Sequence, residues 1–212
     1  MSTCAIVDYE SGNLHSAAKS FQRASDETNG PRIIVTADPD AVRAADRIVL
    51  PGVGAFADCR RGLLAVPGMY EAVEEKVHHG TPFFGICVGM QLLASVGREF
   101  GDTPGFGWLP GEVVHLRPAD PGLKIPHMGW NALAFDRPHP LFRGVEEGAH
   151  AYFVHSYHYL PQDPGDRIAT VHYGQSVTAA LGRDNIFGTQ FHPEKSQSVG
   201  LRVIANFLHW TP

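Results

Sequence analysis

Cys87 stands in the pattern Gly85-x-Cys87-x-Gly89, within an apolar segment that changes character at the cysteine. The residues before it predict a buried strand, and the residues after it predict a helix. Small residues on both sides permit a sharp turn between the two elements, and such a turn exposes the side chain at its tip as a nucleophile. The positive end of the helix dipole would also favour the thiolate form. We therefore predict that Cys87 is the nucleophile of a covalent reaction.

A thiol nucleophile needs an imidazole that a third group orients. The sequence contains 12 histidines. We select His192 because it follows a predicted strand and opens the triplet His192-Pro193-Glu194. Proline fixes the local chain, so Glu194 can turn back and accept a hydrogen bond from the imidazole, which would set its tautomer and stabilise its charged form. The pattern predicts a triad of Cys87, His192 and Glu194.

Other reactive side chains lack comparable surroundings. Cys4 and Cys59 are predicted to be structural, and three cysteines far apart in the sequence make a poor disulfide framework. His155 and His158 lie three residues apart on a predicted strand, so they should point to opposite faces and not share a metal. The sequence has no Cys/His spacing typical of zinc and no phosphate loop. We expect neither a metal nor an organic cofactor.

Composition excludes several function classes. Of 212 residues, 43% are hydrophobic, which is enough for a sizeable core, and the 23 glycines and 16 prolines fall short of the content typical of disorder. The net charge of −5 gives no basic field for nucleic acid or an anionic membrane. The start of the chain lacks the basic region of a secretory signal.

An uncharged segment between Lys76 and Arg98 is long enough to span a bilayer. It contains histidine, proline, glycine and glutamine, and we interpret it as a buried strand followed by a helix. Nucleic acid and membranes are therefore not expected partners. The cysteine content fits a reducing cytoplasm best.

The first half of the chain alternates strand and helix patterns. The predicted strands are Cys4–Asp8, Arg32–Val35, Arg47–Leu50 and Phe83–Ile86. The predicted helices are Pro39–Ala45, Gly68–His79, Val88–Val96 and one that carries Leu14, Ala17, Ala18 and Phe21 and is capped by Ser11 or Asn13. Such alternation requires crossover connections and a parallel sheet covered on both faces.

After about residue 105 the pattern changes to strands joined by short turns, and antiparallel pairs are expected. The predicted strands are Glu112–Leu116, Ala132–Phe135, Tyr152–Leu160, Ile168–Tyr173, Val177–Leu181 and Ile186–Phe191, and a last helix is predicted at Val199–Trp210. No repeat, low-complexity segment or linker composition interrupts the chain. We predict one domain with mixed sheets.

The glycine-flanked Cys87 and the distant Phe191-His192-Pro193-Glu194 together resemble the triad of the class I glutamine amidotransferases. Further blocks extend the resemblance over nearly the whole chain: Pro51–Gly54, Pro126–Asn131, Tyr152–Tyr157 and Phe191–Ser196. These blocks are similar to the branch of the family that serves imidazole glycerol phosphate synthase in histidine biosynthesis. Pro126–Asn131 is the block most specific to that branch.

The resemblance implies an α/β fold of the class I glutamine amidotransferase (flavodoxin-like) type. It has a mostly parallel central sheet with flanking helices and additional antiparallel strands in the C-terminal half, in a single domain of residues 1–212. It also implies hydrolysis of L-glutamine to glutamate and ammonia. Because the chain has no second catalytic domain, the ammonia would pass to a (β/α)8-barrel cyclase subunit in a heterodimer.

The resemblance carries further site residues. The backbone N–H of Val88 and the Gly52-Val53 turn would donate to the oxyanion, and glycine at 52 would let the peptide rotate because it accepts positive φ. The implied substrate contacts are Gln91, Glu99 (an acid near the end of the predicted helix), Ser156 and Tyr157. The implied partner contacts are Asn13, Trp130 and Lys195.

Three other functions stay open from the residues alone. The chain could serve a different synthase, such as that for pyridoxal phosphate, although the Pro126–Asn131 block is not expected there. It could be a free-standing Cys hydrolase of the protease or deglycase type, but those enzymes usually place histidine directly beside the nucleophile, where this chain has Val88. A non-catalytic scaffold is disfavoured by the intact Cys87, His192 and Glu194.

Overall fold

A computed structural model describes residues 2–212. The helices are α1 (Leu14–Thr28), α2 (Pro39–Arg43), α3 (Phe56–Ala65), α4 (Met69–His78), α5 (Val88–Gln91) and α6 (Gln197–Leu208), with 3-10 turns at Pro140–Phe142, Pro164–Asp166 and Pro193–Lys195. The strands are β1 (Thr3–Val7), β2 (Arg32–Thr36), β3 (Arg47–Gly52), β4 (Phe83–Cys87), β5 (Val96–Gly97), β6 (Thr103–Pro104), β7 (Gly111–His115), β8 (His127–Phe135), β9 (His150–His155), β10 (Tyr157–Pro161), β11 (Arg167–His172), β12 (Ser176–Arg183) and β13 (Ile186–Thr189).

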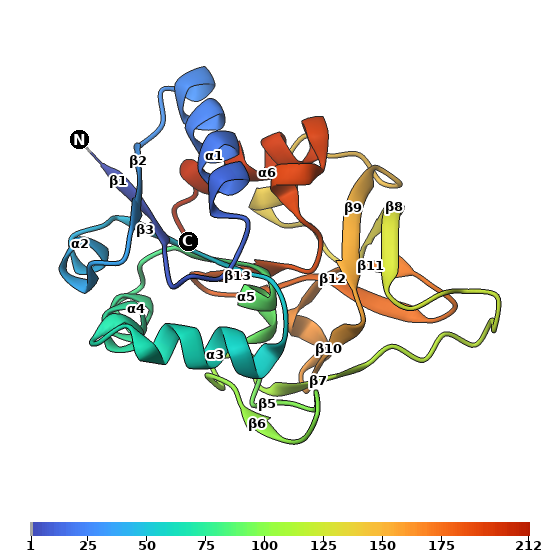
Figure 1. Ribbon diagram of the computed structural model, residues 1–212. Coiled ribbons are helices and arrows are strands. Elements are labelled where there is room, and N and C mark those ends of the chain that lie inside the picture. The colour runs from blue at the N-terminus through green and yellow to red at the C-terminus, as the bar shows by residue number, and fades with distance from the viewer. Residues whose placement is uncertain (1) are drawn as a thin grey trace.

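Nine strands form the central sheet, in the order β2-β1-β3-β4-β13-β12-β11-β8-β9. The strands from β2 to β13 are parallel, and from β13 to β9 neighbouring strands are antiparallel. Figure 1 shows α1 and α6 on one side of the parallel half and α3 and α4 on the other. The predicted parallel first half, its helical cover and the antiparallel second half are confirmed.

Strand β4 lies inside the parallel half, between β3 and β13, and its residues are all buried. The register pairs Gly52 of β3 with Cys87 of β4, and Thr189 of β13 with Ile86. The carboxyl ends of these three strands therefore meet at one edge. In open parallel sheets this is the edge where ligand sites form.

Four phenylalanines attach α1 and α6 to the middle of the sheet. Phe84 of β4 contacts Phe21 of α1, Phe207 of α6 and Phe187 of β13, with ring centroids 5.1 to 6.2 Å apart. All four side chains are fully buried, and burial of one such side chain contributes about 1.5–3 kcal/mol. This packing fixes β4, and with it the end of the strand that carries Cys87.

The second sheet has the order β10-β7-β5-β6 and corrects one sequence prediction. Tyr152–Leu160 was expected to be a single strand, but the chain divides at Ser156 into β9, which belongs to the central sheet, and β10, which pairs with β7. The Ser156 carbonyl accepts a hydrogen bond from the Leu116 N–H (2.9 Å) at the crossing between the two sheets. The sequence does not reveal such a transfer, because no glycine or proline marks a break between Ala151 and Leu160.

The predicted helix Val88–Val96 is wrong in its extent. Helix α5 ends at Gln91, and Val96–Gly97 form strand β5 instead. The carbonyls of residues 92–95 accept hydrogen bonds of 2.7–3.1 Å from backbone amides in the loop 105–109. A helix needs those carbonyls for its own ladder. The tertiary contact with this loop therefore ends the helix after one turn.

Other differences are smaller. Helix α3 was not predicted, although Phe56, Cys59 and Leu63 bury one face of it at helical spacing. Strand β8 begins at His127, five residues before the predicted strand. Asn13 occupies the position that caps α1, but its side chain makes no capping hydrogen bond.

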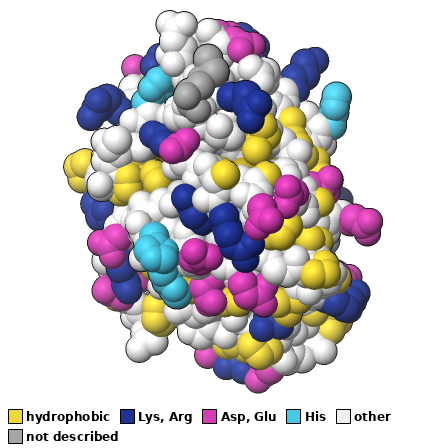
Figure 2. Space-filling view, turned by 90° about the vertical axis from the view of Figure 1, so that its left-hand side faces the viewer, with side chains coloured by type: hydrophobic (Ala, Val, Ile, Leu, Met, Phe, Trp, Pro, Cys, Tyr) yellow, Lys and Arg dark blue, Asp and Glu magenta, His cyan; other side chains and the backbone are white. Residues whose placement is uncertain are grey.

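Charges of both signs are mixed on the surface. Figure 2 shows Lys and Arg side chains interspersed with Asp and Glu side chains on the face that it presents. Arg43 of α2, for example, pairs with Asp40 (2.9 Å) and with Glu75 of α4 (3.3 Å). Within residues 2–212, no helix has both the length and the apolar character needed to cross a membrane.

Candidate active site

Cys87 sits at a strained turn between β4 and α5. Its φ is 55° and its ψ is −112°, a conformation that costs a non-glycine residue on the order of 1–3 kcal/mol. A Cβ on Gly85 would lie 2.6 Å from the Gly89 carbonyl oxygen, and a Cβ on Gly89 would lie 1.9 Å from the Leu50 carbonyl oxygen. Glycine is therefore required on both sides of the cysteine, and the predicted sharp turn is present.

The His192 ring is oriented by the neighbouring acid. His192 Nδ1 lies 2.8 Å from Glu194 Oε1, and both side chains are only 3% exposed. Pro193 opens the 3-10 turn that folds Glu194 back toward the ring. Ser196, which was not singled out from the sequence, holds the backbone because its hydroxyl donates to the His192 carbonyl (2.6 Å) and accepts from the Tyr152 N–H (2.9 Å).

The charge state of His192 is set by two acidic neighbours. Burial alone would lower the pKa of His192, but the negative charge and hydrogen bond of Cys87, followed by those of Glu194, outweigh burial and raise the pKa to about 10. The His192 ring therefore stays protonated and positively charged at neutral pH. The sequence predicted that a helix dipole favours the thiolate form of Cys87. Helix α5 has only four residues, so its dipole is weak. The opposing positive charge comes from His192.

These residues line a cavity of 430 Å³. The predicted site residues in its wall are Val53, Cys87, Val88, Gln91, Glu99, Ser156, Tyr157, His192 and Lys195. Glu194 lies behind His192. Residues that the sequence analysis did not assign to the site also form the wall: Gly54, Pro126, Val154 and His155. Within residues 2–212, no three His, Cys, Asp or Glu side chains converge as a metal site.

Two buried glutamines connect Cys87 to strand β10. Gln91 Nε2 donates to the Tyr157 carbonyl (3.1 Å) and to Gln190 Oε1 (3.0 Å). Gln190 Nε2 in turn lies 3.6 Å from Cys87 Sγ. Gln190 is fully buried. The sequence analysis did not identify it as a site residue, because its only sequence signal is its position two residues before His192. The arrangement fixes the orientation of both amides beside Cys87.

Glu99 lines the cavity but has a second contact. It follows β5 instead of lying near the end of a helix, because the helix expected there stops early. Its Oε2 accepts a hydrogen bond from the Phe56 N–H (2.8 Å) at the start of α3. The Oε1 atom is the oxygen left for a ligand. A carboxylate held in this way suits an ammonium group.

The Gly52-Val53 turn is held in one orientation. The Val53 N–H is directed at Ser11 Oγ (3.5 Å), and the Val53 carbonyl accepts from the Ser11 hydroxyl (3.0 Å) and the Cys59 thiol (3.1 Å). Ser11 is not part of the cavity wall. Gly52 does not use a positive φ here; a Cβ at this position would lie 2.7 Å from the Gly89 nitrogen, so glycine is required by close packing.

A buried histidine pair lies beside the cavity. His155 Nε2 is 3.0 Å from His127 Nδ1, and His155 Nδ1 is 2.8 Å from the Tyr157 carbonyl oxygen. Burial lowers the pKa of His155 to about 3 and that of His127 to about 4, so both rings are neutral. His155 therefore donates to the Tyr157 carbonyl. His158 lies on β10, so the expectation that it shares a strand with His155 is wrong.

The predicted partner-contact residues lie outside or at the rim of the cavity. Trp130 of β8 is 46% exposed and packs edge-on against Tyr152 of β9, with ring centroids 5.9 Å apart. Lys195 Nζ lies 5.9 Å from the centroid of the same Tyr152 ring. Trp130 and Lys195 therefore share one surface. Asn13 lies apart from it, at the start of α1.

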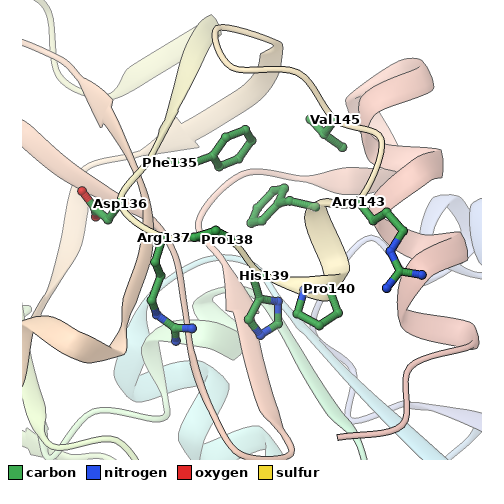
Figure 3. A pocket seen from close by; sticks show the side chains of 9 residues that line it. Phe135, Asp136, Arg137, Pro138, His139, Pro140, Arg143 and Val145 are labelled. Carbon is green, nitrogen blue, oxygen red and sulfur yellow. The ribbon is translucent and has the colours of Figure 1, made fainter.

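A larger cavity of 680 Å³ lies away from the triad, between Phe135 and Val145. Figure 3 shows Arg137 and His139 among its side chains. The Arg137 guanidinium already donates to the carbonyls of Gly165 (3.1 Å) and Gly182 (2.9 Å). This cavity contains no nucleophile, so the cavity at Cys87 is the candidate active site.

Comparison with known proteins identifies the family. The model of the family "Glutamine amidotransferase class-I" matches residues 5–210. The chain belongs to the class-I glutamine amidotransferase family. A protein of Cereibacter sphaeroides is 57% identical over 208 residues, which cover 98% of each chain, and one of Rhodospirillum rubrum is 58% identical over 211 residues, covering 98% of this chain and 99% of the relative. Both are named imidazole glycerol phosphate synthase subunit HisH.

Solved structures show the same fold at much lower identity. A structure described as a glutamine amidotransferase has a TM-score of 0.71 at 16% identity and covers 96% of this chain and 98% of its own. A glutamine amidotransferase from Thermotoga maritima has a TM-score of 0.67, also at 16% identity, and the match covers 91% of this chain and 76% of that protein. The class I glutamine amidotransferase fold predicted from the sequence is confirmed.

Proposed function

We propose that this amidotransferase hydrolyses L-glutamine with Cys87, His192 and Glu194 and passes the ammonia to the cyclase subunit of an imidazole glycerol phosphate synthase. The observation that carries the proposal is the meeting of the Cys87 turn and the His192–Glu194 pair at one cavity. Relatives that bear the name of that synthase are 55–58% identical over nearly the whole chain. Their name supports the pathway of histidine biosynthesis.

The reaction proceeds through a thioester. The Cys87 thiolate adds to the side-chain amide carbon of glutamine, and the carbonyl oxygen becomes an oxyanion. His192 gives its proton to the amide nitrogen, the carbon–nitrogen bond breaks and ammonia leaves. His192 then takes a proton from water as the water adds to the thioester carbon. The carbon–sulfur bond breaks, which releases glutamate and restores the thiolate. Glu194 keeps the ring oriented and stabilises its positive charge.

The oxyanion needs donors that are in place before the charge forms. The Val88 N–H is the first, since it follows the nucleophile and begins α5. The Val53 N–H is the second donor in this proposal, after the peptide turns away from Ser11. Glutamine itself is held by Gln91, by the backbone at Ser156 and Tyr157, and by Glu99, whose carboxylate attracts the α-ammonium group.

The partner binds at the exposed surface around Trp130 and Lys195. Apolar side chains are exposed nearby: Met128 lies on the same strand as Trp130, and Ile125 directly precedes the cavity residue Pro126. Exposed apolar groups of this kind mark binding surfaces. We assign this surface to the (β/α)8-barrel cyclase, with Asn13 as an additional contact. We also propose that residues 1–212 act as one domain, because the central sheet takes strands from both halves of the chain. We place the protein in the cytoplasm, whose reducing conditions suit the free cysteines Cys4, Cys59 and Cys87.

The test is a glutaminase assay of the purified chain, alone and together with the cyclase partner and its acceptor substrate. Glutaminase kcat should rise steeply in the complex. In the same complex, Cys87→Ala should abolish synthesis from glutamine but permit synthesis from added ammonia, because the acceptor chemistry belongs to the other protein. Cys4→Ala is the control, since Cys4 is buried in β1. Full activity of the isolated chain, unchanged by the cyclase, would favour a free-standing hydrolase.

A further inference from the structure

Three hydrogen-bonded side chains connect strand β8 to the wall of the cavity. Asn131 Nδ2 lies 3.3 Å from His127 Nε2. His127 Nδ1 lies 3.0 Å from His155 Nε2, and His155 Nδ1 lies 2.8 Å from the Tyr157 carbonyl oxygen. We call Asn131, His127 and His155 the histidine network. The proposed mechanism gives none of the three a role, although His155 lines the cavity.

The end groups of the network fix the position of every proton in it. Asn131 Nδ2 donates to the His172 carbonyl at 3.0 Å, so the same nitrogen is the donor toward His127. His127 Nε2 is then the acceptor, and Nδ1 carries the proton that is donated to His155. At the other end the Tyr157 carbonyl can only accept, so His155 also carries its proton on Nδ1. Both ends therefore require the Nδ1–H tautomer of each ring.

The surroundings keep the two rings neutral and in place. Both rings are buried, and burial lowers the pKa of His155 and that of His127 far below neutral pH. The His127 ring stacks on the rings of Tyr173 and Phe153, with centroids 4.0 Å and 4.9 Å away. A second proton on either ring would put two N–H groups against each other. The network therefore requires both rings to be neutral.

The network reaches Gln91 through one shared carbonyl. The Tyr157 carbonyl accepts from His155 and also from Gln91 Nε2 (3.1 Å). Gln91 Nε2 donates in addition to Gln190 Oε1 (3.0 Å). Both hydrogens of the Gln91 amide are thus used inside the protein, and Oε1 is the atom of this cavity residue that can accept from a ligand. An acceptor held in this way suits an ammonium group.

We infer that the histidine network fixes the Tyr157 carbonyl, and through it the Gln91 amide, in the orientation that binds glutamine. The inference deepens the proposed function and rests on it. Asn131, His127 and His155 are then positioning residues, because they act on the substrate through Gln91. Loss of the network should weaken glutamine binding and leave the chemical step unchanged.

The alternation of strand β8 separates this role from partner binding. His127 is 2% exposed and Asn131 is half-buried, whereas Met128 and Trp130, which alternate with them, are exposed. Successive side chains of a strand point to opposite faces. One face of β8 therefore supports the substrate site, and the other carries the surface that we assign to the partner.

Replacement of His155 by two different amides separates its donor from its ring. The amide nitrogen of asparagine can occupy the position of imidazole Nδ1, whereas the amide of glutamine reaches the position of Nε2. His155→Asn should therefore keep the donor to the Tyr157 carbonyl, and His155→Gln should lose it.

The loss should appear in KM. One neutral hydrogen bond corresponds to a factor of about 3 to 10 in an equilibrium constant. KM for glutamine should therefore rise about threefold to tenfold in His155→Gln and stay closer to that of the unmodified chain in His155→Asn. In both variants kcat should change little, because Gln91 would hold the substrate equally in the ground state and the transition state.

Steady-state kinetics with glutamine, in the complex with the cognate cyclase and its acceptor substrate, measure both constants. His139→Asn and His139→Gln are the matched controls. Burial lowers the pKa of His139 to about 4, as for the network, but this ring lines the larger cavity away from the triad. A structural role of His155 alone would reduce the folded fraction and with it kcat, at constant KM. That result, or an equal KM in the two His155 variants, overturns the inference.

The tautomers give a second measurement that needs no variant. Nitrogen-15 NMR distinguishes a protonated imidazole nitrogen from an unprotonated one. In the unmodified chain at neutral pH, His127 and His155 should each show a protonated Nδ1 and an unprotonated Nε2. A proton on Nε2 of either ring overturns the network, even where a His155 variant fails to fold.

The unmodified chain tests the proposed function separately. If its glutaminase activity does not depend on Cys87, the proposed function is wrong. If the activity depends on Cys87 and the His155 variants have the same KM as the His139 variants, only the role of the histidine network is wrong.

Discussion

Gln190 Nε2 lies 3.6 Å from Cys87 Sγ, although 103 residues separate the two in the sequence. The contact exists because β13 pairs with β4 in parallel, which brings the residues that follow both strands to one edge. Gln190 also accepts a hydrogen bond from Gln91 (3.0 Å). One buried amide therefore contacts both Cys87, the proposed nucleophile, and Gln91, a residue of the proposed substrate site.

Substitution of Gln190 should affect both binding and catalysis. Gln190→Leu keeps most of the volume but leaves the Gln91 amide without one of its two acceptors. We expect KM for glutamine to rise and kcat to fall, with kcat/KM lower by about tenfold or more, as for one lost buried hydrogen bond. Steady-state kinetics check this, with Gln162→Leu on the exposed loop after β10 as the control. Equal kcat/KM in the two variants would contradict the assignment.

Removal of the charge on Glu194 should impair His192. In Glu194→Gln the ring loses one of the two negative charges that raise its pKa. We expect kcat to fall on the order of 10²-fold, a smaller loss than in His192→Ala. Because the pKa of His192 falls, the alkaline limb of the pH–rate profile should move to lower pH. Glu146→Gln, an exposed acid, is the control, and an unshifted profile with normal kcat would refute the orienting role.

The buried histidines predict loss of stability in acid. The pKa of His155 is lowered from 6.5 to about 3 by burial, so the folded protein keeps this ring neutral. The unfolded chain binds the proton as pH falls below 6.5, and the free energy of unfolding should decrease from there toward pH 3. Each such group contributes a slope of up to about 1.4 kcal/mol per pH unit.

Denaturant unfolding at a series of pH values measures this slope. His155→Gln should remove the contribution of roughly one proton to the slope of the free energy of unfolding between pH 4 and 6. This change in slope is expected whatever the effect of the substitution on stability at neutral pH. His15→Gln, at an exposed position of α1, should leave the slope unchanged. A variant at position 155 with the slope of the unmodified chain would show that the ring is already protonated in the folded state.

Trp130 should contribute to partner binding without serving the chemistry. Its ring is 46% exposed and packs on Tyr152 beside Lys195. Trp130→Ala should weaken binding of the cyclase by tenfold or more, which corresponds to a loss of about 1.4 kcal/mol, and leave the kcat of the free chain unchanged. Titration calorimetry measures the dissociation constant. Val35→Ala on β2, at the other end of the central sheet, is the control.

Several features of the fold could be predicted because they depend on short stretches of chain. The alternation of β1, α1, β2, α2 and β3 follows from apolar periodicity and from Pro39 at the start of α2. The extent of α5 could not be predicted, since its end depends on hydrogen bonds with the loop 105–109. The division of Tyr152–Leu160 at Ser156 likewise depends on which partner strand each half meets.

The sequence by itself determined the local geometry of the proposed nucleophile and its proposed base. The turn at Cys87 and the fold-back of Glu194 onto His192 are constraints within a few residues, imposed by glycine and proline. Only the tertiary structure decided which distant groups surround them. Ser11 reaches Val53 across 42 residues, and Gln190 reaches Cys87 across 103. Such contacts depend on the order and register of β1, β3, β4 and β13, and periodicity along the chain does not specify which strands become neighbours.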